Sequence, residues 1–155
     1  MLDSNQPNAK LRAVMERSLG KAEYAIVLSS RLLGEKADEA LLQNSFGLLD
    51  RHKNSLRWFA LARLGQFDKA IDLATKVRDE SEPAELFELA KLYAACASTA
   101  NDLSQVEKYT EYRDKTIALL QTEAGKLLPK FLIRDDPEFH QIQDEVFLRE
   151  FGFRR

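Results

Sequence analysis

The fold of this chain follows from one stretch, Leu64-Gly65-Gln66-Phe67-Asp68-Lys69-Ala70. A glycine comes directly after a leucine there, and a short turn separates it from an aspartate and an alanine. Glycine adopts the left-handed conformation that ends many helices, and an acidic residue near a helix start interacts favourably with the helix dipole. The same order occurs one residue longer over residues 33–40. The sequence therefore holds two copies of a signal that ends one helix and begins the next.

Apolar residues on either side of this turn recur at intervals of three and four, as on one face of a helix. Valine, isoleucine and threonine are few, and no segment alternates at a period of two. Both observations predict an all-α fold, with glycine and proline separating the helices. The eight predicted helices span residues 8–19, 21–33, 37–49, 52–64, 67–80, 83–98, 103–123 and 138–151.

Capping residues mark three of the predicted helix starts. Asp136 followed by Pro137 is typical of a capping residue with proline at the first helical position. Asp102 with Gln105 three residues later resembles a capping box, and Pro83 opens another helix. Gly47 interrupts the helix predicted at 37–49 without an evident reason.

The turn resembles the inter-helix turn of tetratricopeptide repeats, with Gly65 turning, Phe67 as its aromatic residue and Ala70 as the small packing residue. Leu89, Ala90 and Tyr93 match the first helix of the next repeat. The resemblance implies an α-solenoid in one domain over residues 1–155. It would comprise an N-terminal helix, three hairpins (21–49, 52–80 and 83–123) and a C-terminal capping helix at 136–151. Trp58 departs from the family, which prefers a small residue there.

A narrower resemblance is to the helical repeat array C-terminal to large bacterial Ser/Thr protein kinases. Residues 63–94 carry it, together with a closing tail of Asp136, Pro137, Phe139, Ile142 and Phe147. No glycine-rich loop or catalytic kinase segment is present, so the chain is not itself a kinase. The resemblance implies a regulatory role in bacterial signalling, acting in trans.

The charge and cysteine content argue against several other classes. The 23 basic and 25 acidic residues give a net charge of −2, and the basic residues are scattered, so nucleic-acid binding is not expected. Cys96 is the only cysteine, which suits a reducing compartment. The sequence shows no signal-peptide pattern and no apolar run of membrane-spanning length. We therefore expect a cytoplasmic protein without a membrane partner.

Residues able to carry chemistry are scarce and far apart in the sequence. His52 and His140 are the only histidines and show no metal-binding spacing. Cys96 lies among alanines, where a small thiol packs well, and Asp136 is already assigned to capping. We therefore expect no catalytic residue, metal or cofactor, although a small helical enzyme remains an alternative.

The expected function is that of a non-catalytic scaffold or adaptor module for protein binding. The first helices of stacked hairpins line the concave face of a solenoid. A groove with two aromatic residues and two cations would suit a peptide or helix carrying acidic groups. Self-association is a further possibility. The residues predicted to line the groove are His52, Ser55, Phe59, Arg63, Phe87 and Lys91.

Overall fold

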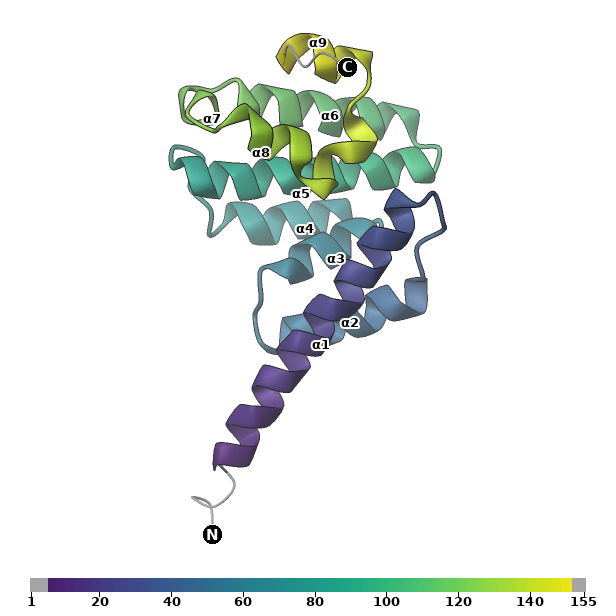
Figure 1. The fold of residues 1–155 in the computed structure, drawn as a ribbon, viewed down its shortest axis with the longest axis vertical. Coiled ribbons are helices and arrows are strands. Elements are labelled where there is room, and N and C mark those ends of the chain that lie inside the picture. The colour runs from purple at the N-terminus through teal and green to yellow at the C-terminus, as the bar shows by residue number, and fades with distance from the viewer. Residues whose placement is uncertain (1–5, 152–155) are drawn as a thin grey trace. The chain divides into compact units, whose positions relative to one another are not determined.

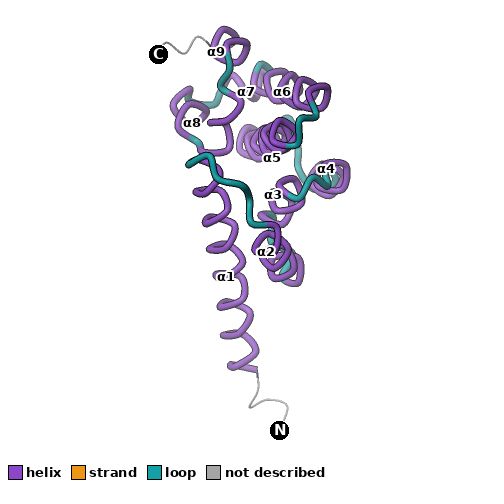
Figure 2. Tube along the Cα trace, turned by 90° about the vertical axis from the view of Figure 1, so that its right-hand side faces the viewer, coloured by secondary structure: helices purple, strands orange, loops and turns teal. Residues whose placement is uncertain are grey.

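The computed structural model describes residues 6–151, and every regular element in that range is a helix (Figures 1 and 2). The all-α prediction is therefore confirmed for the described residues. The elements in chain order are α1 (Gln6–Leu32), α2 (Glu39–Arg51), α3 (Leu56–Arg63), α4 (Phe67–Thr75), α5 (Pro83–Asp102), α6 (Val106–Leu120), α7 (Glu123–Lys126), α8 (Lys130–Asp135), the 3₁₀ helix η2 (Pro137–Ile142) and α9 (Glu145–Phe151).

The chain forms two compact units, the first ending at Ala60 and the second beginning at Leu61. Helix α3 contributes residues to both. Each unit has buried apolar side chains of its own and is described by itself below. The single repeat domain expected over residues 1–155 stays a prediction.

The first unit is built on an antiparallel pair, α1 and α2. Glu16 near one end of the pair contacts Arg51, and Glu23 further along α1 contacts Asn44. The two helices approach closely at Gly20, where an added Cβ would lie 3.0 Å from the side chain of Leu49. A Cβ at position 20 would require the Leu49 side chain to shift by a few tenths of an ångström, so glycine favours this close approach.

Helix α1 corrects the prediction of two helices at 8–19 and 21–33, because it runs unbroken through Gly20. A glycine inside a helix costs only about 1 kcal/mol relative to alanine. The close approach offsets this cost, and the Ser45 hydroxyl donates a hydrogen bond of 2.7 Å to the Gly20 carbonyl. Gly20 thus belongs to a packing contact and does not end a helix.

The second unit is organised around α5, which packs against α4 on one side and α6 on another. The turn that leads into α4 is formed as predicted. Gly65 has a φ of +82°, and both Phe67 and Ala70 are buried. Pro83 is the first residue of α5, and the Glu82 carboxylate caps that helix by accepting from the Glu85 N–H.

The C-terminal third differs most from the prediction. The helix expected at 103–123 is two helices, α6 and the short α7, and the proposed Asp102 capping box is wrong because Asp102 is the last residue of α5. Helix α8 was not predicted. The capping helix expected at 138–151 is divided into η2 and α9, because Asp144 caps a new helix. Asp136 caps η2 as predicted.

Candidate functional site

Three of the residues predicted to line a groove belong to the first unit. His52 lies just after α2, and its Nε2 is 2.9 Å from the Glu16 carboxylate. Ser55 is half-buried before α3. Phe59 is only 2% exposed and packs edge-on against Tyr24, with ring centroids 6.3 Å apart. A partner would therefore not reach Phe59 without a rearrangement of the unit.

The other three, Arg63, Phe87 and Lys91, lie together in the second unit, where η2 packs against α5. The Phe87 ring lies 5.8 Å from that of Phe139 between centroids, and Lys91 lies 3.5 Å from the carboxylate of Asp136. Residues 136–139 thus place a carboxylate and an aromatic ring against Lys91 and Phe87, where a partner carrying acidic groups was expected. The chain's own C-terminal segment covers this part of the predicted groove.

The Arg63–Glu138 pair lies at the centre of that contact. The two side chains approach to 2.6 Å, and each is almost fully buried. The Arg63 guanidinium also donates to the Ser98 hydroxyl at 2.6 Å and to the Gln141 side chain at 3.3 Å. Buried ionic groups require this degree of pairing, because an unpaired charge in the interior is costly. The network fixes where η2 docks on α5 and does not present a free cation to solvent.

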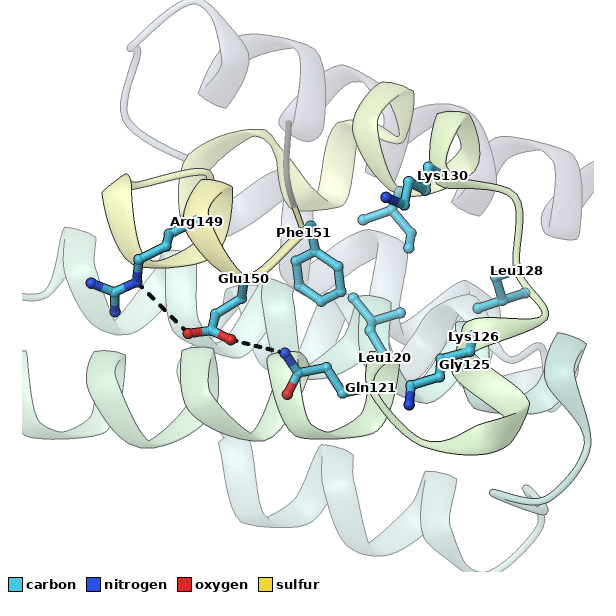
Figure 3. Close-up of a pocket in the computed structure, with 10 residues that line it drawn as sticks. Leu120, Gln121, Gly125, Lys126, Leu128, Lys130, Arg149, Glu150 and Phe151 are labelled. Atoms are coloured by element: carbon cyan, nitrogen blue, oxygen red, sulfur yellow. Dashed lines mark hydrogen bonds and ion pairs between the residues drawn. The ribbon is translucent and has the colours of Figure 1, made fainter. Parts of the chain in front are cut away.

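An open cavity lies elsewhere in the second unit, where α6, α7, α8 and α9 meet (Figure 3). We call it the C-terminal cavity. Its volume is about 650 Å³, within the range of small-ligand and side-chain pockets. Figure 3 shows Phe151 near the middle, with Arg149 and Glu150 on one side and Lys126, Leu128 and Lys130 on the other. The lining residues are Leu120, Gln121, Gly125, Lys126, Leu128, Lys130, Ile133, Arg149, Glu150 and Phe151.

The turn between α6 and α7 sets one wall of the cavity. The Thr122 hydroxyl accepts a hydrogen bond from the Gly125 N–H and donates one to the Leu119 carbonyl. A Cβ on Gly125 would lie 2.4 Å from the carbonyl oxygen of Leu120. Only glycine allows α7 to fold back so closely on the end of α6. Pro129 then precedes α8 with a φ of −60°.

Helix α9 closes the opposite wall and is anchored through Asp144. The Asp144 carboxylate accepts hydrogen bonds from the Tyr109 hydroxyl at 2.6 Å, the Arg113 guanidinium at 2.9 Å and the Phe147 N–H at 2.9 Å. Burial opposes ionisation of Asp144, but these hydrogen bonds and the charge of Arg113 hold its pKa below the usual value. Burial and the same carboxylate raise the pKa of Tyr109 to about 12.

The cavity wall is predominantly basic. Lys126 and Lys130 are exposed, and neither makes an ion pair with any residue in the described part of the chain. Arg149 lies 3.8 Å from Glu150, whose carboxylate also accepts from Gln121 at 3.0 Å. Three cations therefore face one carboxylate around an apolar lining of Leu120, Leu128, Ile133 and Phe151. This arrangement fits an apolar group that carries a negative charge beside it.

The remaining residue types that could carry chemistry were located in the described range as well. Cys96 is fully buried in α5, and burial raises the pKa of its thiol far above the usual range. Within residues 6–151 no three His, Cys, Asp or Glu side chains are grouped so that they would hold a metal ion. None of the helices in that range has a stretch apolar enough to cross a bilayer.

Comparison with known proteins gives no family assignment. No protein-family model, curated protein or solved structure matches the chain. The sequence reasoning missed the C-terminal cavity because its walls come from four separate helices. One local signal was available, since residues 126–131 (Lys-Leu-Leu-Pro-Lys-Phe) place two basic residues among apolar ones on either side of a proline.

Proposed function

We propose that the chain is a non-catalytic, protein-binding module of tetratricopeptide-like helical repeats, and that the C-terminal cavity receives a partner segment. The segment would carry one large apolar side chain with carboxylates close to it. The turn at Gly65, the buried Ala70 and the buried Leu89, Ala90 and Tyr93 support the repeat part of the proposal. The unpaired Lys126 and Lys130 beside an apolar lining carry the binding part.

The chemistry of the cavity favours a short anchored segment over a broad flat contact. Binding energy at interfaces concentrates in a few apolar side chains that fill pockets. The floor of Leu120, Ile133 and Phe151 supplies such a pocket. Exposed lysines add little affinity as single pairs, but they favour acidic sequences and speed association. Leu127 and Phe131, which follow Lys126 and Lys130 in the sequence, form a further apolar pair outside the lining and are 74% and 55% exposed.

Selection from a display library of random 12-residue peptides on the full chain tests this proposal. We expect the selected peptides to combine a Leu, Phe or Tyr with neighbouring Asp or Glu. Their affinity should fall at least tenfold for the double variant Lys126→Glu/Lys130→Glu, and it should decrease with rising salt.

The matched control is Lys36→Glu/Lys76→Glu, which makes the same charge change at two exposed lysines outside the cavity. Peptides that lose affinity equally for both double variants would respond only to net charge, and the proposal would be wrong. Binding of a fluorescent fatty acid, measured in parallel, tests whether the cavity instead receives the apolar chain and carboxylate of a lipid. If the fatty acid binds in a Lys126-dependent manner and no peptide does, the cavity is a lipid-carboxylate site and not a protein-binding one.

A further inference from the structure

Helix α1 has a second apolar face, which points away from α2. Tyr24 and Val27 are buried on the face that packs in the first unit, together with Gly20. On the opposite face Leu11, Met15 and Ile26 are 59%, 62% and 55% exposed. A helix that is apolar on two opposite faces is expected to be covered on both.

The exposed face follows a regular stripe along the helix. We call it the α1 stripe. Counted outward from Ala22 in either direction, its positions are separated by four, then three, then four residues. No charged residue occurs in the stripe, and the charges of α1 lie beside it. Its members are all exposed, and the last of them directly follows the end of α1: Leu11, Met15, Ser18, Ala22, Ile26, Ser29 and Leu33.

The spacing of the stripe is symmetric about Ala22, and this symmetry identifies what covers it. When two copies of α1 pack antiparallel with Ala22 at the two-fold axis, residues equally far from position 22 face each other. Met15 then faces Ser29 and Ile26 faces Ser18, so a large side chain meets a small one in each pair. Ala22 meets its own copy, where a small residue allows close approach. Leu11 and Leu33 face each other at the two ends.

From this pattern we infer that the α1 stripe is a homodimer interface, occupied by the α1 stripe of a second copy of the chain. An isologous contact requires a surface that is complementary to itself under a two-fold rotation, and the stripe has this property. Val14 and Leu19 flank it and are 49% and 50% exposed, so they widen its apolar surface.

The area available is sufficient for a stable pair. The exposed parts of the large apolar side chains of α1 amount to roughly 500 Å². A standard interface buries about 800 Å² per partner, of which somewhat more than half is apolar. Helix α1 is also long enough, since the stripe from Leu11 to Leu33 extends over about 33 Å at 1.5 Å per residue. Figure 1 shows α1 as a long helix that continues past the end of α2.

The test measures the mass of the full chain in solution by light scattering during size exclusion at tens of micromolar. We expect the wild-type chain to be a dimer. Ala22→Glu and Ala22→Lys should each be monomeric, because each brings two like charges together at the two-fold axis. An equimolar mixture of the two variants should recover the dimer. Ala40→Glu and Ala40→Lys are the matched controls, since Ala40 is exposed on α2, and both should remain dimeric.

Three results would overturn the inference: a monomeric wild-type chain, dimeric single variants at position 22, or a mixture that stays monomeric. A monomeric wild-type chain would mean that another part of the chain, or another protein, covers the stripe. If circular dichroism shows that a position-22 variant has lost helix, a second pair applies the same test. Met15→Glu should dissociate the dimer, and Met15→Glu combined with Ser29→Lys should restore it, because these positions face each other.

Discussion

At the scale of single residues, two glycines in helices should respond in opposite ways when they are replaced by alanine. Gly47 lies inside α2, is exposed, and an added Cβ would meet nothing within 4 Å. Alanine is favoured over glycine in such a position by about 0.5–1 kcal/mol, because glycine loses more backbone freedom on folding. We therefore expect Gly47→Ala to raise the free energy of unfolding by about that amount, measured by urea denaturation followed by circular dichroism.

Gly125→Ala provides the contrast for that measurement. Its Cβ would lie 2.4 Å from a backbone oxygen, which does not move as a flexible side chain would. Overpacking of this kind typically costs about 1–3 kcal/mol, so this variant should be destabilised. An unchanged or lower stability of Gly47→Ala would show that Gly47 has a role that its open surroundings do not reveal.

Asp144 is a residue whose ionisation should stabilise the C-terminal helices. Its pKa is held below the unfolded value of about 3.9, so its contribution to stability is present above that pH. The contribution is lost as the pH falls through the folded-state pKa. Asp144→Asn should reduce the free energy of unfolding by about 2 kcal/mol at pH 7, since it weakens bonds to Tyr109 and Arg113.

The pH dependence separates this effect from a simple loss of packing. In urea titrations from pH 7 to pH 2, the difference between wild type and Asp144→Asn should shrink below about pH 4, as the wild-type carboxyl becomes protonated. Asp72→Asn removes an exposed carboxylate of α4 and serves as the control, with little expected change. A difference that stays constant down to pH 2 would exclude ionisation as its source.

At the scale of elements, the docking of η2 depends on the buried ion pair between its Glu138 and Arg63, the last residue of α3. Removing one partner leaves the other charge buried and typically costs about 3–5 kcal/mol. Glu138→Gln and Arg63→Met should therefore each be strongly destabilising. The double variant should cost clearly less than the sum of the two, because it leaves no uncompensated charge. Urea denaturation of the wild type, the two single variants and the double variant completes a double-mutant cycle. If the losses in unfolding free energy simply add, the two side chains are not coupled.

The elements also show where sequence patterns are sufficient and where they fail. The turn at Gly65 and the start of α5 at Pro83 were predicted because a left-handed glycine and a first-turn proline act locally. Gly20 was misread because its role depends on Leu49 and Ser45, which belong to another helix. Short helices such as α7 and α8 carry too few periodic positions to be recognised by spacing.

In the candidate site, too, contacts between distant segments could not be predicted from local sequence patterns. The sequence predicted that Arg63, Phe87 and Lys91 line a groove for a partner carrying acidic groups, and in the structure these three residues lie against residues 136–141 of the same chain. The sequence did not indicate this contact, because contacts between distant segments leave no periodic signal. The C-terminal cavity was missed for the same reason.

At the scale of the whole molecule, the division into two units is the feature that local patterns do not reveal. The repeated Leu-Gly turn suggests one continuous array, yet each unit has a separate set of buried side chains. Leu42, Leu49 and Phe59 belong to the first, and Leu86, Leu92 and Phe147 to the second. A chain with two separate cores is expected to unfold in more than one step.

Trp58 allows this expectation to be tested, because it is the only tryptophan and is buried in the first unit. Its fluorescence should follow unfolding of that unit, whereas circular dichroism follows the helices of both. Gly47→Ala should raise the urea midpoint seen by fluorescence. Phe147→Ala should cost about 3–5 kcal/mol in the second unit and leave the fluorescence midpoint in place. Coincident transitions for both probes, shifted equally by both variants, would instead show that the two cores unfold as one cooperative structure.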